Sequence, residues 1–580
     1  MSHWDETFDF VIVGSGGGSM CAALAAKDHG LKPLILEKLD KVGGSTALSG
    51  GVWWIPNNPP MKRIGREDSY DKARSYLKAV FSGFTSRGAS PERVDAFLRT
   101  GPEMVKYLEK KGMQFHVPKC WPDYYDDRPG GEQLSRSLVA KMFDLKELGE
   151  WEGRLNVYPN FDLPLHPDSM SDVLLLKRTW AGKKAAAGVA FRTIRDKLTR
   201  SRVRGQGAAV QGRMLQLALR NEIPIWTETA VIELVVEDGR VVGVVAMRGG
   251  QPVRIRAVNG VLLNAGGFAR NAAMRQAYQR KPISNTWTNA NKGDTGEMLE
   301  ACMELGAATE NLDLSIWIAT SLMPNGDPAP GTVRDGDILP SMLPLDMSKP
   351  GCILVDSRGE RFVNESGSYM DVGEAMYEKG VAPFWFIMDQ TNRDRYMWGG
   401  RFGVPKEWLT TGFMKKADSI EALARDCGID AQSLRGTVDR FNGFTREGKD
   451  LDFNRGGRCY DRWNGDPTNE PNPSLGPIEK GPFYAVAAFP GDVGTFGGMV
   501  CDENARVLRE DGSLIEGLYA TGNCTSSVLG RFYPGAGGSI AASFIFGYIA
   551  AMHAAGEDIL SSGDREDASG ESRKAVASAS

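Results

Sequence analysis

Short apolar runs that stop at a glycine turn recur along the chain, and they predict the strands of a parallel sheet. Residues 8–13 form the first such run and end at Gly14. An alanine-rich stretch at residues 22–30 predicts a helix, and residues 34–37 form the next apolar run. Buried parallel strands have this unbroken apolar character, whereas half-exposed strands alternate. A strand, a helix and a second strand in this order predict a Rossmann-type βαβ unit.

Later segments predict further parts of the same α/β domain. Residues 231–237 and 240–247 are expected to form a hairpin about an Asp-Gly turn. Residues 260–267 and 517–523 are two more apolar runs that enter polar or glycine-rich loops. Residues 540–555 are apolar over a longer stretch and predict a buried helix.

The middle of the chain has a different pattern. Residues 281–487 lack the strand–glycine repeats and carry many Pro, Trp and Tyr, so we expect an α+β catalytic (cap) domain inserted into the first domain. The Rossmann-type domain is then expected at residues 1–280, with a basic insertion near residues 165–210, and again at residues 488–556. Residues 557–580 are rich in Ser, Asp, Glu, Arg and Ala and are expected to be disordered.

Composition narrows the class of protein. The 580 residues are 42% hydrophobic and 24% charged, as in an ordinary globular protein with a large core. A formal net charge of -4 argues against nucleic acid as the main partner. The eight cysteines contain no CxxC pair, so no metal site and no thioredoxin-like redox pair is expected. An acidic N-terminal stretch without signal-peptide features, and no apolar run of membrane-spanning length, favour the cytoplasm.

The first glycine turn has the spacing of a dinucleotide-binding motif. Glycines here allow a tight turn and a close approach of the backbone to a pyrophosphate at a helix N-terminus. An acidic residue at the end of the second strand can accept hydrogen bonds from an adenosine ribose. The third motif position, usually Gly or Ala, is a serine. The predicted contacts are Gly14, Gly16, Gly17, Gly18, Ser19, Glu37 and Lys38.

Further glycine and hydroxyl clusters favour FAD over NAD, because they offer contacts to a second, longer part of the cofactor. Residues 42–51 follow the second strand, and residues 264–267 and 520–523 lie at the ends of later strands. The predicted contacts from these loops and from the start of the C-terminal helix are Gly43, Gly44, Ser45, Thr46, Gly50, Gly51, Ala265, Gly266, Gly522, Asn523, Gly538, Ser539 and Ile540.

These four elements, in this order, resemble the fumarate reductase and succinate dehydrogenase flavoprotein superfamily. The resemblance implies that they wrap FAD and that a cap domain is inserted before the last segment. Residues 43–51 contain no histidine, so the FAD is expected to be non-covalent. The arginine, histidine and Arg-Leu-Gly-Gly-Asn features of the dicarboxylate enzymes are not matched at the C-terminal motif, where the chain has Gly-Arg-Phe-Tyr-Pro-Gly-Ala-Gly-Gly-Ser.

That motif resembles instead the 3-ketosteroid Δ1-dehydrogenases, as do two further segments. One is Glu-Arg-Phe-Val-Asn-Glu-Ser at residues 360–366, followed by Tyr369, and the other is Pro-Asp-Tyr-Tyr at residues 122–125, followed by Pro-Gly-Gly at residues 129–131. The likeness covers nearly the whole chain, with residues 165–210 as the main exception. It implies 1,2-desaturation of a 3-ketosteroid, with a hydride passing from C1 to flavin N5.

Four residues carry the expected chemistry. Tyr533 and the backbone N–H of Gly537, at the start of a helix, are expected to polarise the C3 carbonyl. Tyr369, by the resemblance, is expected to take a proton from C2. A tyrosine has an ordinary pKa of about 10 and needs help to act near neutrality. Tyr124, or Tyr125 beside it, is the expected helper.

Other interpretations stay open at this point. A Δ4-dehydrogenase of 3-keto-5α-steroids would share the carbonyl contacts, and a fumarate reductase-like flavoprotein or an electron carrier without its own substrate site is less favoured. Tyr533 is also compatible with a purely structural turn, and Tyr369 with an ordinary cap-domain tyrosine. The steroid, the electron acceptor and the oligomeric state are not predicted.

The basic segment at residues 177–204 suggests a separate hypothesis. It contains ten Lys or Arg residues and one acidic residue, Asp196, interleaved with Trp180, Phe191 and other apolar side chains. A basic stretch with such residues suits peripheral contact with an anionic membrane surface. A solvated basic helix explains the pattern equally well, and nucleic-acid binding has little support because no recognised fold accompanies the charge.

Overall fold

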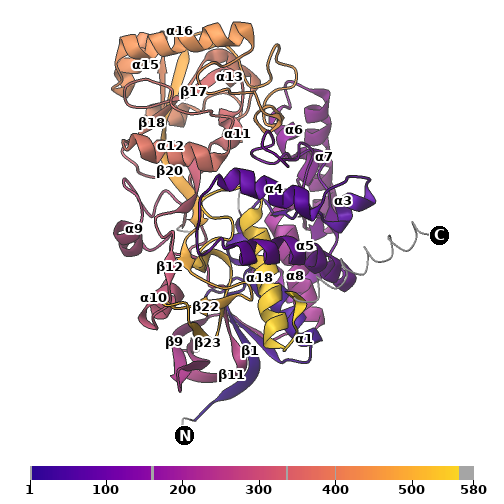
Figure 1. The fold of residues 1–580 in the computed structure, drawn as a ribbon. Coiled ribbons are helices and arrows are strands. Elements are labelled where there is room, and N and C mark those ends of the chain that lie inside the picture. Colours follow the sequence, from indigo (N-terminus) through magenta and orange to yellow (C-terminus); the bar gives the residue numbers. More distant parts are fainter. Residues whose placement is uncertain (1–2, 159–161, 335–336, 399, 561–580) are drawn as a thin grey trace, which may run out of the picture.

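The computed structural model describes residues 3–158, 162–334, 337–398 and 400–560. Two sheets form two halves of the molecule, with a parallel sheet at the bottom of Figure 1 and a second sheet at the top. Of the tail expected to be disordered, residues 561–580 lie outside the described residues. Glu557 does not: its carboxylate lies 3.3 Å from Nδ1 of His29.

The larger sheet is parallel at its centre. Strand β1 (Glu6–Val13) lies between β2 (Pro33–Leu36) and β11 (Gln251–Leu263), and both run parallel to it. Beyond these, β8 (Ile225–Trp226) pairs in parallel with β2, and β23 (Leu514–Ala520) pairs in parallel with β11. This is the arrangement expected of a dinucleotide-binding sheet, whose ligand lies beyond the carboxyl ends of the strands.

The register brings the ends of four strands level with one another. Val13 of β1 pairs with Leu36 of β2 and with Leu263 of β11, and Leu263 pairs with Ala520 of β23. The loops that follow these strands therefore leave from one edge of the sheet. Their first residues are Gly14, Glu37, Asn264 and Thr521.

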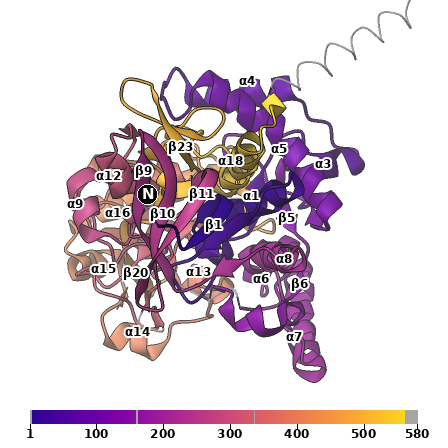
Figure 2. The same ribbon diagram turned by 90° about the horizontal axis from the view of Figure 1, so that it is seen from below.

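An antiparallel hairpin extends from this sheet. It consists of β9 (Thr229–Glu237) and β10 (Arg240–Arg248), which confirms the predicted hairpin, and β10 pairs with the first half of β11. Figure 2 views the molecule from the side where this hairpin lies. On the same side of β11, β23 pairs with its second half, and β22 (Arg506–Leu508) closes that edge next to β23.

Three helices cover the parallel sheet. Helix α1 (Gly17–Asp28) begins earlier than the stretch predicted from residue 22 and packs against α18 (Gly538–Ala554) and α8 (Gln206–Arg220). Other elements of this half are α2 (Gly44–Leu48), β3 (Val52–Trp54), α3 (Pro59–Arg63), α4 (Tyr70–Phe81), α5 (Pro91–Lys111), β4 (Phe115–His116), β5 (Ser137–Ala140), β6 (Phe143–Asp144), α6 (Met170–Leu174), α7 (Trp180–Thr199), β7 (Val203–Arg204), α9 (Ala272–Tyr278), α10 (Glu297–Glu304), β12 (Thr309–Glu310) and β21 (Gly498–Met499).

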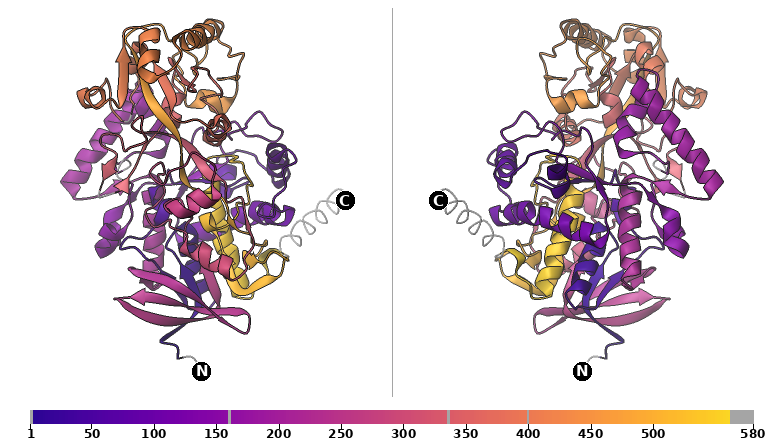
Figure 3. Two further views of the ribbon diagram at one scale, coloured as in Figure 1. Left: turned by 90° about the vertical axis from the view of Figure 1, so that its left-hand side faces the viewer. Right: turned by 90° about the vertical axis from the view of Figure 1, so that its right-hand side faces the viewer.

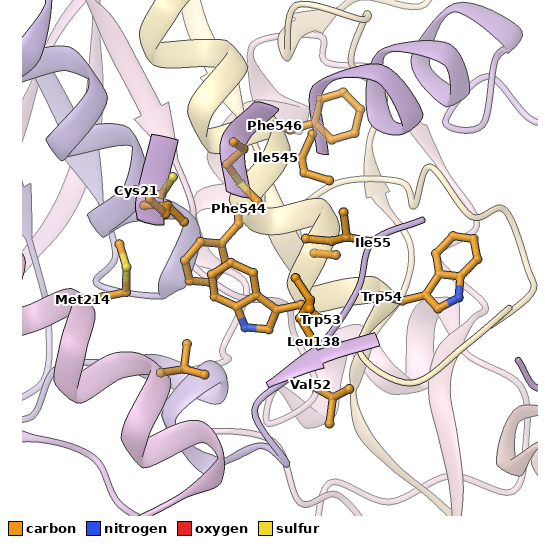
Figure 4. Close-up of a cluster of buried hydrophobic side chains, with 14 of the residues drawn as sticks. Cys21, Val52, Trp53, Trp54, Ile55, Leu138, Met214, Phe544, Ile545 and Phe546 are labelled. Carbon is orange, nitrogen blue, oxygen red and sulfur yellow. The ribbon is translucent and has the colours of Figure 1, made fainter. Parts of the chain in front are cut away.

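A buried aromatic contact holds α18 in place. The ring centroids of Trp53 on β3 and Phe544 on α18 are 4.1 Å apart (Figure 4). Phe115 meets Trp53 edge-on at 5.1 Å. All three side chains belong to the largest buried cluster. Burying large rings in this way contributes on the order of 2 kcal/mol or more each, so the start of α18 is firmly positioned.

The second half is built on an antiparallel sheet. Its central strand is β20 (Phe483–Thr495), flanked by β13 (Ser315–Ser321) and β18 (Phe384–Met388). The predicted domain boundary at residues 487 and 488 falls inside β20. The other elements are β14 (Val333–Arg334), β15 (Asp337–Ile338), β16 (Ser341–Met342), α11 (Pro344–Met347), β17 (Cys352–Val355), α12 (Tyr369–Lys379), α13 (Gln390–Arg395), α14 (Lys406–Thr410), β19 (Met414–Ala417), α15 (Ile420–Cys427), α16 (Ala431–Glu447) and α17 (Cys459–Trp463). Figure 3 shows this half above the parallel sheet from two sides.

Candidate active site

A cavity of about 850 Å³ lies beyond the ends of the parallel strands and extends under the second half of the molecule. Predicted residues of both kinds line it, those for the dinucleotide and those for the reaction. They are Gly14, Gly16, Glu37, Lys38, Gly44, Ser45, Thr46, Gly50, Ala265, Gly266, Gly522, Asn523, Ser539, Ile540, Gly537, Tyr124, Tyr369 and Tyr533.

The remaining predicted cofactor residues have other surroundings. They are Gly17, Gly18, Ser19, Gly43, Gly51 and Gly538, and none of them lines this cavity among the residues that the structure describes. A Cβ at Gly17 would lie 1.8 Å from the Phe544 ring, and a Cβ at Gly18 would lie 2.2 Å from the Ser543 carbonyl oxygen. These two glycines are therefore required by the packing of α1 against α18, because any side chain would push the helices apart.

Glu37 is held at the end of β2 by hydrogen bonds to both of its oxygens. Oε1 accepts the Leu39 N–H at 2.9 Å, and Oε2 accepts the Ser15 N–H at 3.1 Å and the Ser15 hydroxyl. Burial raises the pKa of this carboxyl, and these bonds act in the opposite direction. The carboxylate lines the cavity one residue after the strand, where a dinucleotide ribose is bound in this type of sheet.

A second carboxylate in the cavity was not predicted. Asp294 is buried, which raises its pKa to about 7, and its Oδ2 accepts the Ser45 hydroxyl at 3.2 Å. Nearby, the side-chain nitrogen of Asn289 lines the same cavity and has no hydrogen-bond partner among the described residues. The only sequence signal was the polar run Asn-Ala-Asn-Lys-Gly-Asp at residues 289–294, which reads equally well as an ordinary loop.

These residues fit FAD. A Cβ at Gly44 would meet nothing closer than the Cα of Gly16, at 3.8 Å, so open space borders this glycine loop where a cofactor passes. The unpartnered amide nitrogen of Asn289 and the carboxylates of Glu37 and Asp294 supply the donors and acceptors that ribose and ribityl hydroxyls need.

Three tyrosines from three different segments meet in the cavity. The ring of Tyr369, the first residue of α12, lies 5.3 Å from that of Tyr124 and 5.5 Å from that of Tyr533, measured between centroids. The rings of Tyr124 and Tyr533 lie 6.0 Å apart, so each of the three rings is close to the other two. The tyrosines singled out from the sequence therefore form one cluster.

The structure distinguishes Tyr124 from its neighbour. Tyr124 lines the cavity, whereas the hydroxyl of Tyr125 donates to Asp371 at 2.7 Å outside it. The backbone N–H of Tyr124 donates to the Pro534 carbonyl at 2.9 Å, which ties this segment to the loop that carries Tyr533.

Gly537 and Tyr533 converge at the N-terminus of α18. The Tyr533 hydroxyl lies 2.9 Å from the Ser539 hydroxyl and accepts the Ser539 N–H at 3.4 Å, and Gly537, the N-cap of α18, lines the same cavity. Backbone N–H groups at the start of a helix stabilise negative charge, because they have no carbonyl partner in the helix and the helix dipole is positive there. The geometry is suited to holding an oxygen atom that gains negative charge.

Burial shapes the acidity of the tyrosines. It raises the pKa of Tyr369 and of Tyr124 well above the ordinary value; the neighbouring Tyr533 raises the pKa of Tyr369 further, whereas Tyr124 lowers it. For Tyr533, burial raises the pKa, and the bonds from Ser539 and Gly537 lower it. An ionised Tyr369 thus depends on the hydroxyl groups around it.

A Rossmann-type sheet, a cavity that fits FAD and a tyrosine cluster beside it define a flavin-dependent oxidoreductase. The family described as FAD binding domain matches residues 9–540. A 3-oxosteroid 1-dehydrogenase of Mycolicibacterium smegmatis is 40% identical over 94% of this chain and 97% of its own. The chain belongs to the family of 3-oxosteroid 1-dehydrogenases within the FAD-binding flavoproteins, as its resemblance in sequence predicts.

Solved structures agree with this assignment. The 3-ketosteroid Δ1-dehydrogenase of Sterolibacterium denitrificans, solved with 1,4-androstadiene-3,17-dione, is 35% identical with a TM-score of 0.87 and matches 95% of this chain and 100% of its own. The 3-ketosteroid-Δ4-(5α)-dehydrogenase of Rhodococcus jostii, solved with 4-androstene-3,17-dione, is 21% identical with a TM-score of 0.62 and matches 96% of this chain and 98% of its own. The second likeness shows a shared fold only.

Two tyrosines that line the cavity, Tyr158 and Tyr460, were not predicted from the sequence. Tyr460 on α17 lines the cavity, and its ring centroid lies 4.4 Å from that of Tyr124. No motif singles it out, because it sits in a short polar segment, Cys-Tyr-Asp-Arg-Trp, without glycine or a clear apolar period.

Proposed function

We propose that this enzyme removes hydrogen from C1 and C2 of 3-ketosteroids, and that Tyr369, Tyr533, Tyr124 and Gly537 divide the chemistry among them. The observation that carries the proposal is the meeting of three tyrosine hydroxyls and the Gly537 N–H in one cavity with the dinucleotide loops. FAD, when bound, supplies the acceptor for the hydride that leaves C1.

Tyr533 and Gly537 hold the C3 carbonyl oxygen. Loss of a proton from C2 moves negative charge onto this oxygen, so two donors aimed at one point stabilise the enolate more than the ketone. Gly537 is fixed for this role by the start of α18, and the Tyr533 hydroxyl is fixed by Ser539. Removing one such donor from an enzyme typically reduces turnover by about two to three orders of magnitude.

Tyr369 takes the C2 proton. Its oxygen must be ionised at that moment, and the hydroxyl of Tyr124 favours the ionised form by donating to it. The C2 proton then bonds to the Tyr369 oxygen, the C1 hydride leaves as an electron pair with its hydrogen, and a double bond forms between C1 and C2. Each of these proposed roles is assigned to a group that lines the cavity.

Apolar walls suit a steroid nucleus. Trp121 and Trp463 line the cavity with ring centroids 4.9 Å apart, and Ile316 and Ile318 of β13 line it as well. Aromatic and branched side chains bind a planar apolar ligand by dispersion and by the exclusion of water.

An anaerobic titration tests the reaction directly. Androst-4-ene-3,17-dione is added to the flavin-loaded enzyme while flavin absorbance is followed and the steroid product is identified. Bleaching with formation of the 1,4-diene supports the proposal. Bleaching only with a 3-keto-5α-steroid would assign the Δ4 reaction instead. No bleaching with either steroid would contradict steroid dehydrogenation.

We also propose that α7 places the enzyme on an anionic membrane surface. Its apolar residues Trp180, Phe191, Ile194 and Leu198 are 83%, 68%, 58% and 79% exposed. At 3.6 residues per turn they lie within about 40° of one line along the helix. Gly182 and the side chains of Ala185 and Asp196 are buried on the opposite side. This helix therefore turns its apolar stripe outward, and Figure 2 shows α7 at the edge of the molecule.

The basic residues of α7 and its position next to the cavity also support binding to an anionic membrane surface. Lys183, Lys184 and Arg195 flank the stripe, as in helices that lie in the headgroup region of anionic membranes. The segment leading into α7 lines the cavity through Leu163, Leu165, Met170, Val173 and Leu174. A lipid-dissolved substrate would thus meet the cavity lining next to the membrane. Among the described residues, the helices are all too short or too polar to cross a bilayer.

Vesicle binding tests this surface. The enzyme is co-sedimented with phosphatidylglycerol–phosphatidylcholine vesicles at low salt, and a triple variant replaces Phe191, Ile194 and Leu198 by Ser. The matched control replaces three exposed apolar residues elsewhere, Val258, Val381 and Leu451, by Ser. We expect the first variant alone to lose binding; equal binding by the wild type and that variant would contradict the proposal.

A further inference from the structure

Tyr125 lies beside Tyr124 in the chain, but its side chain contacts the helix that carries Tyr369. Its ring is buried, and its hydroxyl donates to Oδ1 of Asp371 at 2.7 Å. Asp371 lies two residues after Tyr369, in the first turn of α12. One hydrogen bond between the two halves of the molecule therefore joins the neighbour of one cavity tyrosine to the helical turn of another.

The first turn of α12 has the sequence of a capping box but does not form one. Ser368 is the N-cap and Asp371 is the third helical residue, a spacing at which the two side chains usually cap the helix start between them. Here Ser368 makes no side-chain cap hydrogen bond, and the Asp371 carboxylate accepts the Tyr125 hydroxyl instead. A contact from another segment thus holds this turn in place of a local cap.

The backbone on the other side of Tyr125 is bonded to the loop that carries Tyr533. The Tyr125 N–H donates to the Tyr76 hydroxyl at 3.3 Å, and that hydroxyl donates to the Pro534 carbonyl at 2.6 Å. The Tyr124 N–H donates to the same carbonyl at 2.9 Å. The three segments that carry the cavity tyrosines are therefore linked through Tyr125 and its neighbour.

The segment around Tyr125 has a firm support of its own. The carboxylate of Asp123 accepts the Trp54 indole N–H at 2.8 Å and the Arg136 Nη1 at 2.6 Å. The side chains of Asp123 and Arg136 are both fully buried. Charge-assisted bonds in a buried site are strong and restrict motion. The Tyr125 hydroxyl consequently reaches α12 from a fixed base.

We propose that Tyr125 is a positioning residue: its hydrogen bond to Asp371 sets where the first turn of α12 places the Tyr369 oxygen in the cavity. The inference rests on the proposed function, in which Tyr369 takes the C2 proton. Tyr125 does not line the cavity and acts only through Tyr369. Proton transfer requires the base to lie within hydrogen-bond reach of the proton, and a displacement of about 1 Å can slow a reaction by about two orders of magnitude.

A double-mutant cycle tests the bond. We expect Tyr125→Phe and Asp371→Ala each to lower kcat by about ten- to a hundredfold, with KM changed less than about twofold. The double variant should lose no more than the slower single variant, because both changes remove the same bond. Additive losses in the double variant, or a wild-type kcat in Tyr125→Phe, would overturn the inference.

A conservative variant separates position from charge. Asp371→Asn keeps an oxygen that accepts the Tyr125 hydroxyl but removes the negative charge. We expect its kcat to stay within about threefold of the wild type. An Asp371→Asn enzyme as slow as Asp371→Ala would show that the charge of Asp371 matters and not the bond, which contradicts a positioning role for Tyr125.

A matched control separates this role from general loss of packing. Tyr377 also lies on α12 and is buried, and its hydroxyl donates to the Pro490 carbonyl at 3.3 Å. Tyr377→Phe therefore removes a buried tyrosine hydroxyl from the same helix, away from its first turn. We expect both Tyr→Phe variants to show a lower Tm, but Tyr377→Phe to keep kcat within about twofold. Equal losses of kcat in the two variants would overturn the inference.

Two further comparisons keep the outcome interpretable. Tyr369→Phe is measured in parallel: if it keeps turnover, the proposed base is wrong, whereas an inactive Tyr369→Phe with a wild-type kcat for Tyr125→Phe overturns the role of Tyr125 alone. If Tyr125→Phe does not retain FAD, the two variants at Asp371 decide from the other side of the bond. Loss of kcat in Asp371→Ala and its retention in Asp371→Asn are then expected, and an equal kcat in both overturns the inference.

Discussion

Gly537 approaches Val52 so closely that a Cβ at position 537 would lie 1.8 Å from the Val52 carbonyl oxygen. Its φ of 84° also lies in the left-handed region, which a side chain disfavours. The loop that carries Tyr533 can therefore rest on β3 only with glycine at this position. The contact places the first N–H groups of α18 in the cavity.

Gly537→Ala is expected to reduce turnover by at least about two orders of magnitude, because the loop must move and one of the two carbonyl donors moves with it. Steady-state kinetics with androst-4-ene-3,17-dione measures the effect. Gly436→Ala is the matched control, since nothing lies within 4 Å of a Cβ at Gly436 in α16. The control should keep its activity; equal losses in both variants would contradict a local role for Gly537.

Tyr369→Phe is expected to lower kcat by about two to four orders of magnitude, because it removes the oxygen that we propose takes the C2 proton. The flavin should remain bound, since the side chain belongs to α12 and not to the dinucleotide loops. Flavin absorbance of the purified variant and single-turnover bleaching by the steroid check the two statements. Rapid bleaching in the variant would remove Tyr369 as the base.

Turnover is expected to rise with pH from the neutral into the alkaline range. Tyr369 must lose its proton before it can accept one from C2, and burial raises its pKa above the ordinary value of about 10. The reactive fraction therefore grows as the pH approaches that pKa from below. A kcat profile that reaches a plateau below about pH 7 would show that another group is the base.

Glu37→Gln is expected to weaken FAD binding by roughly tenfold or more, because a buried carboxylate that accepts three hydrogen bonds is replaced by an amide whose NH₂ faces donors. Release of flavin fluorescence on dilution measures the affinity. Glu103→Gln is the control, since Glu103 is exposed and pairs with Lys106 at 2.7 Å. Unchanged affinity in Glu37→Gln would contradict a role for this carboxylate at the cofactor.

The sequence predicts the fold well wherever a single local pattern determines where a segment lies in the structure. The runs at residues 8–13, 34–37, 260–267 and 517–523 lie on adjacent strands of one sheet, because unbroken apolar runs before polar turns have few other places in a fold. The hairpin at residues 231–247 also formed as predicted. Tyr124, Tyr369 and Tyr533 lie far apart in the chain, and they were singled out as site residues by resemblance to a family and not by a local pattern.

Contacts between distant segments could not be predicted in this way. The glycine spacing suggested a pyrophosphate contact for Gly17 and Gly18, yet their lack of side chains is demanded by α18, more than 500 residues later. Tyr460 and Asp294 reach the cavity through tertiary packing, and their local sequences do not distinguish them from ordinary surface or loop residues. The sequence also did not predict that the apolar stripe of α7 faces outward, because a basic helix of this kind can pack on the protein through either of its faces.

The placement of β23 and α18 has a consequence for how the molecule is made. Both follow the whole cap in the chain, yet β23 completes the sheet started by β1, and α18 fills the glycine face of α1. During synthesis, the N-terminal part of the chain keeps an unpaired strand edge and an uncovered face on α1 until β23 and α18 have left the ribosome. The flavin pocket is therefore finished last, and a polypeptide that stops before residue 514 lacks a side of it.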